Sequence, residues 1–167
     1  TYTDSKQLAT AATSAGLNYA FSYDAYGNPT GATTTAAGDA NRSMTSTATY
    51  MTNHSRLESV TDNNNATTWY DYNSRGDLTS VLSPNVADLT NADFYSTDYT
   101  YDVMGNVTRI VKQPVGLYST PVVSLPMSTV NYTYTNTRLT KIALINQFYS
   151  FAYDSFGRPT TTQVGSG

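Results

Sequence analysis

Seven short phrases, each built around a Tyr, recur along this chain of 167 residues. The fullest copy, YTYDVMGNVTRIV, runs from Tyr99 to Val111. The copies are anchored, at spacings of 19 to 33 residues, on Tyr2, Tyr23, Tyr50, Tyr72, Tyr101, Tyr134 and Tyr153. A unit this short is too small to fold alone, so the repeat predicts an array of stacked units in which each one is supported by its neighbours.

Each phrase predicts a β-hairpin. Its aromatic residues stand at positions i and i+2, which places pairs such as Tyr99 and Tyr101 on one face of a strand. Asp102 follows, and it suits the first position of a turn because its carboxylate can accept a bond from the backbone N–H two residues on. Gly105 stands where such a turn needs a positive φ, and the Thr and β-branched residues after it favour a returning strand.

The same turn chemistry recurs in the other copies that contain glycine. The expected structural turn residues are Asp24, Gly27, Gly76, Asp102, Gly105, Asp154 and Gly157. Asn73 and Thr135 stand in place of the Asp in two copies. Turn capping explains this exchange, whereas acid catalysis or metal binding would not readily tolerate it, so the recurring acids are interpreted as structural.

The composition favours an all-β fold of tandem antiparallel β-hairpins. Fifteen residues are Tyr and only 13% are charged, a profile of β-rich rather than helical chains. We expect residues 1–167 to form a single array of about seven repeats, without a separate domain. Insertions, read as connections or edge segments, are expected near 30–49, 83–98 and 112–131, and Ser83 to Phe94 could include a short helical turn.

Charge and hydropathy exclude several classes of function. The net charge is −3 and the Lys and Arg residues are dispersed, so no basic patch for nucleic acid or an anionic membrane is expected. The chain contains no cysteine, which excludes disulfides and thiolate metal sites. No apolar run approaches the roughly 20 residues of a membrane span, and no signal segment is recognisable.

Catalytic and metal-binding patterns are also missing from the sequence. His54 is the only histidine, so a zinc site with two histidines cannot form. Residues 62–65 lack the alternating acids and terminal Glu of a calcium loop and predict a turn. There is no nucleophile elbow and no phosphate-binding loop. We therefore expect no catalytic residue, no metal ligand and no cofactor, and the chain is predicted not to be an enzyme.

Aromatic residues offer one candidate binding site. Trp69, the single Trp, is adjacent to Tyr70 and close to Tyr72, and exposed aromatic rings on a β-surface can stack on sugars. The same rings can instead pack along the sheet as cross-strand pairs, which the regular recurrence of Tyr favours. Trp69, Tyr70 and Tyr72 are therefore kept as possible sugar-stacking residues beside the packing interpretation.

The phrases YDYNSRGDLTSV, YTYDVMGNVTRI and FAYDSFGRPTTT, with RLESVTDNNNATTWYDY, resemble the RHS or YD repeat over nearly the whole chain, from Tyr2 to about Thr162. Proteins with this repeat include Rhs polymorphic toxins, the C components of Tc insecticidal complexes, wall-associated proteins and teneurins. The resemblance implies a long β-sheet that spirals into a hollow shell. A shell uses many hundreds of residues, and the Asp-Pro-x-Gly-Leu type signature of the toxins is absent, so this chain resembles a stretch of repeats without cargo.

The predicted function is that of a non-catalytic structural scaffold. Unpaired strand edges in the terminal hairpins predict association with neighbouring repeats or end to end with other copies, into oligomers or filaments. The alternative is a module that binds carbohydrate or a cell-surface partner through exposed Tyr and Trp. Neither nucleic acid nor a membrane span is expected, and the resemblance implies a secreted or cell-surface bacterial location.

Overall fold

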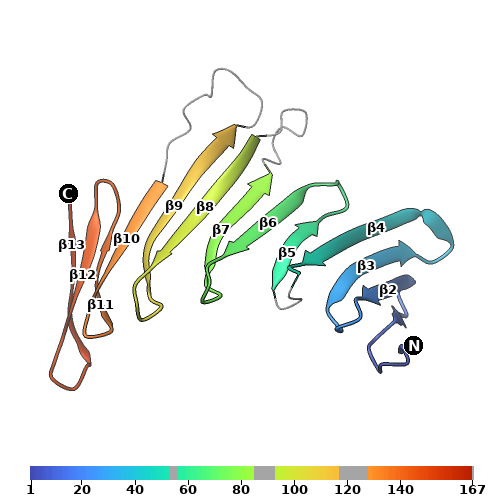
Figure 1. The fold of residues 1–167 in the computed structure, drawn as a ribbon, viewed down its shortest axis with the longest axis horizontal. Helices are drawn as coiled ribbons and strands as arrows, with labels where there is room; N and C mark the ends of the chain where they lie inside the picture. The colour runs from blue at the N-terminus through green and yellow to red at the C-terminus, as the bar shows by residue number, and fades with distance from the viewer. Residues whose placement is uncertain (53–55, 85–92, 117–127, 167) are drawn as a thin grey trace. The chain divides into compact units, whose positions relative to one another are not determined.

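The structure, a computed structural model, describes residues 1–52, 56–84, 93–116 and 128–166 (Figure 1). All regular structure in these residues is β-strand, and the order of the strands in the sheet follows their order in the chain. The predicted all-β class, built from antiparallel hairpins, is confirmed. Residues 85–92, the centre of the expected helical turn, lie outside the described residues. The described part of the chain has no helix that is both long and apolar enough to cross a membrane.

Two compact units divide the chain, Thr1–Tyr70 and Asp71–Gly167. In the first unit each strand pairs antiparallel with the next one in the chain. Its strands are β1 (Thr10–Ala12), β2 (Leu17–Tyr23), β3 (Pro29–Ala36), β4 (Asp39–Tyr50), β5 (Leu57–Thr61) and β6 (Thr67–Tyr72), of which β6 ends in the second unit.

The second unit repeats this arrangement. Its strands also pair antiparallel in chain order, and β13 stands at the end of that order. The strands are β7 (Leu78–Pro84), β8 (Asp93–Tyr101), β9 (Val107–Gly116), β10 (Ser128–Thr135), β11 (Arg138–Ala143), β12 (Phe148–Tyr153) and β13 (Pro159–Gly165).

The two faces of the first unit carry different side chains. The register places Phe21 opposite Ala32, and Ala48 opposite Val60, on one face. The other face carries hydroxyl pairs across neighbouring strands, with oxygen–oxygen distances of 3.2, 2.8 and 2.8 Å for Thr33–Thr45, Thr49–Ser59 and Thr61–Thr67. Because such cross-strand pairs stabilise a sheet, the Thr-rich sequence supplies contacts along the hydroxyl face.

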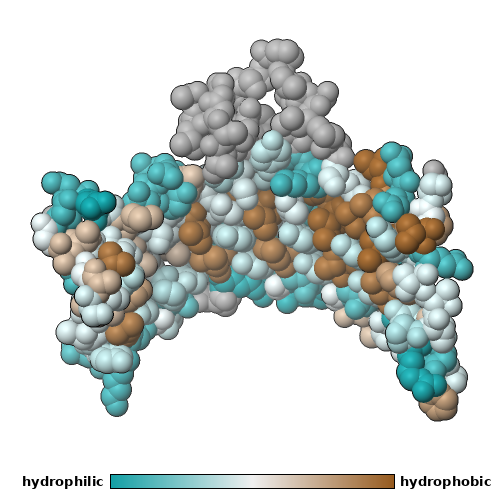
Figure 2. Space-filling view, turned by 180° about the vertical axis from the view of Figure 1, so that it is seen from behind, coloured by the Kyte–Doolittle hydropathy of each residue, from teal (hydrophilic) through white to brown (hydrophobic). Residues whose placement is uncertain are grey.

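In the second unit the apolar face combines aromatic and aliphatic side chains. Tyr99 lies opposite Ile110 and Tyr132 lies opposite Ile142, while the other face carries Asp98 opposite Val111. Tyr99 and Tyr101 share a face, as the phrase predicts. Figure 2 shows one side of the molecule, on which bands of apolar residues alternate with bands of polar ones.

Little of the described chain is fully buried. Val111 is its buried hydrophobic residue, with 5% of its surface exposed, and Ser59 and Ser96 are its buried polar residues, each at 7%. Most aromatic residues of the strands are half-buried by their lateral neighbours. The hairpins are therefore held by strand pairing and side-chain contacts along the sheet rather than by a closed core.

The expected connection or edge segment near residues 30–49 is wrong. These residues form most of β3 and β4, and each of these strands is paired on both sides. Thr suits a pleated, half-buried surface, and cross-strand hydroxyl pairs such as Thr33–Thr45 join these strands on one face. The expected insertion near 112–131 is likewise partly strand, because Lys112–Gly116 belongs to β9 and Ser128–Asn131 to β10; residues 117–127 lie outside the described chain. Near 83–98, the described residues belong to β7 and β8.

One tight turn is strained and can be improved. Asn136 and Thr137 join β10 to β11 as a two-residue loop, with φ of 51° and 67°. Such loops favour Asn-Gly, and a β-branched residue at positive φ is unfavourable. Thr137→Gly is expected to raise the free energy of unfolding by about 1 kcal/mol in urea titration. Thr140→Gly, a strand substitution, should lower it; equal effects of the two changes would contradict the turn geometry.

Candidate functional site

Asp102 shows the geometry of the turns. Its Oδ1 accepts hydrogen bonds from the backbone N–H groups of Met104 and Asn106, both at 2.9 Å, and its Oδ2 accepts one from Asn106 Nδ2 at 2.9 Å. Gly105 has a φ of +88°, and its N–H donates to the Asp102 carbonyl at 3.1 Å. The carboxylate is therefore occupied by groups of its own turn.

The same geometry recurs at the other turn positions. Asp24 and Asp154 each accept two backbone N–H bonds, and Asn73 accepts three through its side-chain oxygen. Gly27, Gly76 and Gly157 have φ values of 90°, 96° and 85°. At residues 62–66 the expected turn forms around Asp62, with Asn65 at a φ of 60° in place of the glycine. Local hydrogen bonding thus occupies the side-chain oxygens of these Asp and Asn residues.

Hydrogen bonding also changes the acidity of two of these carboxyl groups. The side-chain bond from Asn106 lowers the pKa of Asp102 below its usual 3.8, with backbone N–H bonds adding to the effect. The backbone and side-chain bonds from Arg158 lower the pKa of Asp154 in the same way. Both groups are thus held in the charged form that accepts the turn bonds.

This acidity predicts a pH dependence of stability. The pKa of Asp102 and of Asp154 is lower in the folded chain than in the unfolded chain. The two carboxylates therefore stabilise the folded chain above pH 3.8, and this stabilisation is lost as the pH falls through the lowered pKa. The wild-type melting temperature should therefore fall more steeply in acid than that of Asp102→Asn combined with Asp154→Asn, measured from about pH 5 to about pH 2.

Asp71→Asn is the matched control for this series. Asp71 is exposed and its carboxylate accepts no hydrogen bond within the described residues. Its variant should follow the wild-type pH profile. A double turn variant with the same acid slope as wild type would contradict the assigned role of the two carboxylates.

Several tyrosine hydroxyls connect a hairpin to the one before it. Four of them donate to a backbone carbonyl of the preceding returning strand or its start. The bonds run from Tyr23 to Leu8 at 2.9 Å, from Tyr50 to Pro29 at 3.0 Å, from Tyr101 to Leu78 at 2.6 Å and from Tyr153 to Leu139 at 2.7 Å. We call these four contacts the tyrosine bonds.

The tyrosine bonds share one geometry. Between β7 and β8 the last paired residues are Ser80 and Asp98; Tyr101 stands three residues after Asp98, and its acceptor Leu78 stands two before Ser80. The same offsets hold for the pairs Thr10–Ala20, Gly31–Thr47 and Lys141–Ser150. Each bond therefore continues the contact between hairpins beyond the end of the ladder, where the strands no longer pair.

Burial helps to keep one of these hydroxyls protonated. Desolvation raises the pKa of Tyr101 above its usual 10.0, and the nearby Asp77 and Tyr99 act in the same direction. A protonated hydroxyl is required for donation to the Leu78 carbonyl. Tyr134 occupies the same offset relative to the Arg109–Asn131 pair, but its hydroxyl donates no hydrogen bond within the described residues.

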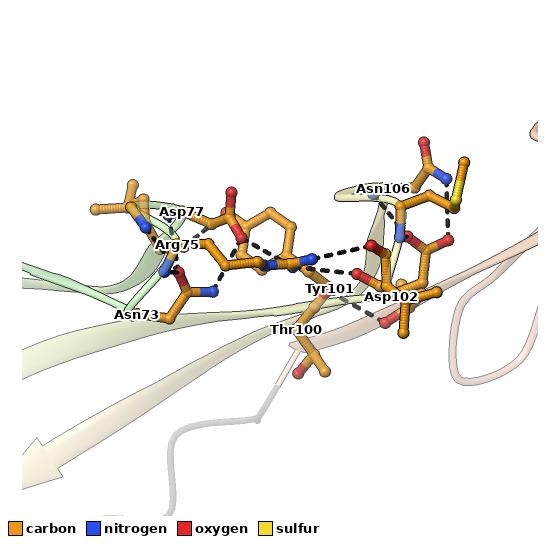
Figure 3. Close-up of polar contacts among 12 residues, drawn as sticks. Asn73, Arg75, Asp77, Thr100, Tyr101, Asp102 and Asn106 are labelled. Atoms are coloured by element: carbon orange, nitrogen blue, oxygen red, sulfur yellow. Dashed lines mark hydrogen bonds and ion pairs between the residues drawn. The ribbon is translucent and has the colours of Figure 1, made fainter.

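Long polar side chains form a second contact between successive turns. Arg75 donates from Nη1 to the Val103 carbonyl and from Nη2 to the Asp102 carbonyl, both at 3.1 Å. Its Nη2 also lies 2.9 Å from Asp77 Oδ2, which accepts a bond from Asn73 Nδ2. Figure 3 shows this side chain reaching from its own turn to the next one. In the first unit, Gln7 Nε2 donates to the Gly27 carbonyl at 3.1 Å in the same manner.

A polar cluster on β7, β8 and β9 joins three strands. Asp98 Oδ1 accepts from Ser80 Oγ at 2.9 Å and from Ser96 Oγ at 2.5 Å, and its Oδ2 accepts from Gln113 Nε2 at 3.1 Å. Every polar partner in this cluster belongs to the sheet itself. The arrangement joins the three strands and helps to fix their register.

The candidate sugar-stacking residues do not share one surface. Trp69 pairs with Ser59 on the hydroxyl face, so alternation along β6 puts Tyr70 on the opposite face. Tyr72 is the last residue of β6. Trp69 is 40% exposed and lies near the Thr61–Thr67 hydroxyl pair. Any stacking surface on the hydroxyl face would therefore use Trp69 without Tyr70.

Other candidate sites are shallow or missing in the described residues. A groove of about 410 Å³ lies over β1, β2 and β3, lined mainly by Thr, Ala and Asn side chains, including Thr10, Asn18 and Thr35. The described residues contain no group of three or more His, Cys, Asp or Glu that could hold a metal ion. His54 lies outside the described chain.

Sequence reasoning missed the tyrosine bonds, although the sequence carries a signal for them. The first aromatic position of the phrase is filled by Phe in two copies, Phe21 and Phe151, and by Ala48 in another. The second position is Tyr in all seven copies. Packing alone accepts Phe at either position, so the recurring hydroxyl is a sequence signal for the hydrogen bonds that four of these tyrosines donate.

Comparison with known proteins identifies the fold. No protein-family model matches the sequence, and no curated protein matches it. Among solved structures, 99% of this chain aligns with the crystal structure of TcdB2-TccC3-Cdc42 at a TM-score of 0.76 and 19% identity. The Tc holotoxin pore of Photorhabdus luminescens aligns over 99% of the chain at a TM-score of 0.77 and 18% identity.

The chain spans 9% of the length of each of these two proteins. At this level of identity the likeness concerns the fold, and it agrees with the motif on which the sequence resemblance rests. The hairpins, their turn residues and the aligned structures together show that the chain resembles the RHS or YD-repeat shell of Tc toxin complexes.

Proposed function

We propose that this chain is a non-catalytic structural β-scaffold, a stretch of repeats of the kind that builds an RHS or YD-repeat shell. The observation that carries this proposal is the use made of its most regular residues. Asp and Gly close turns, and Tyr joins a hairpin to the preceding one, as at Asp102, Gly105 and Tyr101. Because the recurring Asp, Gly and Tyr residues serve the turns and the contacts between hairpins, they do not form a repeated catalytic group.

We expect the scaffold to grow by pairing of further strands at the edges of its sheet. In the strand order of the described residues, β13 pairs only with β12. An unpaired edge can add a strand from neighbouring repeats of a longer chain or from another copy. We propose head-to-tail association through such edges, a heterologous contact that gives oligomers or filaments when it does not close. The single array of about seven repeats and a secreted or cell-surface bacterial location belong to the same proposal.

Light scattering over a wide concentration range tests the association. The average mass should rise with concentration, and negative-stain images of the same sample should show chains or filaments rather than particles of one size. A mass that stays at that of a monomer at the highest concentration would contradict end-to-end association of copies.

Carbohydrate binding is the second candidate function. It is favoured by the position of Trp69, whose exposed ring lies among hydroxyl-bearing side chains on one face of the sheet. A ring with hydrogen-bonding groups beside it suits a sugar, which has both C–H and O–H surfaces. Glycan-array binding that is lost in Trp69→Ala and kept in Tyr70→Ala, with unchanged circular dichroism, would support it. A wild-type chain that binds no glycan would exclude it.

A further inference from the structure

We propose that the outer edge of β13 is a docking site for a hairpin that carries the Tyr phrase, with the Pro159 carbonyl as acceptor for the incoming Tyr hydroxyl. The inference rests on the proposed scaffold function and adds to it the chemistry and register of the partner. It follows from the geometry of the tyrosine bonds, which recurs within both units.

In three of the four tyrosine bonds the acceptor stands six residues after the preceding Tyr of the phrase, while Leu139, after the two-residue loop, stands five residues after Tyr134. The turn before Pro159 makes the same backbone bonds as the turn before Pro29, so the distance of six applies to it. In the first unit Tyr23 is followed six residues later by the acceptor Pro29 and eight residues later by Gly31, the end of the ladder to β4. In the second unit Tyr72 is related in the same way to Leu78 and Ser80. Counted from Tyr153, these positions are Pro159 and Thr161.

Backbone direction agrees with this assignment. Next to the Thr10–Ala20 pair, the Phe21 N–H donates to the Ala9 carbonyl at 2.8 Å, so Phe21 directs its polar groups toward β1 and away from β3. Its β3 partner Ala32 therefore directs its own groups toward β4. Thr162 is the partner of Phe151 at the corresponding place in β13, so its N–H and carbonyl face outward.

The outer edge of β13 is accessible. All its residues except Gly165 are exposed, and Val164 has 61% of its surface exposed. Pro159 has no N–H to satisfy, and its carbonyl can accept a hydroxyl as that of Pro29 does from Tyr50. The incoming strand must supply backbone groups opposite Thr160 and Thr162 and a Tyr three residues beyond the partner of Thr161.

This chemistry identifies the partner as another hairpin of the same phrase. In β8 the residue that pairs with the end of the ladder is Asp98, and Tyr101 follows it at the required offset. A strand with Phe at that position could still add to the edge through its backbone, but it would lack the bond that specifies register. The edge should therefore select Tyr over Phe.

A hairpin peptide with the sequence of Asp93–Gly116 tests the inference against the full chain. Titration by calorimetry should show the Tyr101 peptide binding about two- to tenfold more tightly than its Tyr101→Phe form, the worth of one hydrogen bond. Hydrogen exchange should show new protection of the outward amides of Thr162 and Val164. In the chain, Thr162→Pro removes the outward donor at an edge position that tolerates proline, and Thr162→Val keeps the donor.

The proposal requires tight binding of the Tyr peptide to the Thr162→Val chain and loss of binding to the Thr162→Pro chain. Equal binding of the Tyr and Phe peptides, with protection of the Thr162 amide, would show that the Pro159 carbonyl does not accept the Tyr hydroxyl. Strand addition at the outer edge of β13, and with it the proposed scaffold function, would still stand. Absence of binding by both peptides, when circular dichroism shows that each one forms the hairpin, would overturn the docking edge itself. If Thr162→Pro unfolds, as judged by circular dichroism, the comparison of Tyr and Phe peptides on the unaltered chain decides.

Discussion

Gly157→Val is expected to lower the free energy of unfolding by about 1–3 kcal/mol. Gly157 has a φ of +85°, a backbone conformation in which a β-branched residue is strained. A Cβ built there would also lie 2.5 Å from Arg138 Nη2, so the guanidinium has to move. That movement would disturb its position 5.9 Å from the Tyr153 ring.

Gly105→Val separates the two causes of destabilisation, which are the backbone strain at positive φ and the displacement of Arg138. Gly105 has a φ of +88°, and a Cβ built there meets nothing within 4 Å. Gly105→Val should therefore show the backbone strain alone, within the same range of about 1–3 kcal/mol but with the smaller loss. Urea unfolding of the two variants measures both losses in free energy of unfolding, and we attribute the difference between them to the displacement of Arg138.

Asn at either position is the matched control. Asn65 already occupies the equivalent place in the turn of residues 62–66, at a φ of 60°. Gly105→Asn should thus cost much less than Gly105→Val, because Asn tolerates the left-handed region. Equal losses from Asn and Val, or no loss from Val, would show that a positive φ is not what selects glycine here.

Much of the local structure could be predicted because it depends on residues close together in the chain. Asp, Gly and the aromatic spacing specify a strand, a turn and a returning strand through local hydrogen bonds and backbone preference, as at Asp102 and Gly105. The all-β class follows from the repetition of that unit. These rules need no knowledge of the neighbouring hairpin.

Contacts between hairpins were harder to predict. The acceptor of the Tyr101 hydroxyl is a backbone carbonyl 23 residues away, and every residue has such a carbonyl. Only the register of the paired strands shows that the Leu78 carbonyl is the one in reach. The Thr-rich strands near 30–49 were missed for a related reason, since hydroxyl pairs such as Thr33–Thr45 form only when two strands are aligned.

Removing two tyrosine bonds from the second unit should also weaken it measurably. The variant Tyr101→Phe combined with Tyr153→Phe keeps both rings and loses the hydroxyls that donate to Leu78 and Leu139 at 2.6 and 2.7 Å. Each lost bond is worth about 0.5–1.5 kcal/mol, so the pair should lower the free energy of unfolding by about 1–3 kcal/mol in urea titration.

Tyr134→Phe tests whether the hydrogen bond or the hydroxyl itself is responsible. Tyr134 occupies the same position of the phrase, yet its hydroxyl donates no bond within the described residues. Its replacement should change the free energy of unfolding by less than about 0.5 kcal/mol. If Tyr134→Phe destabilised the chain as much as Tyr101→Phe does, general hydration or packing of the phenol would explain the invariant Tyr. A loss confined to Tyr101 and Tyr153 would instead show that the hydroxyl is retained because it joins one hairpin to the next.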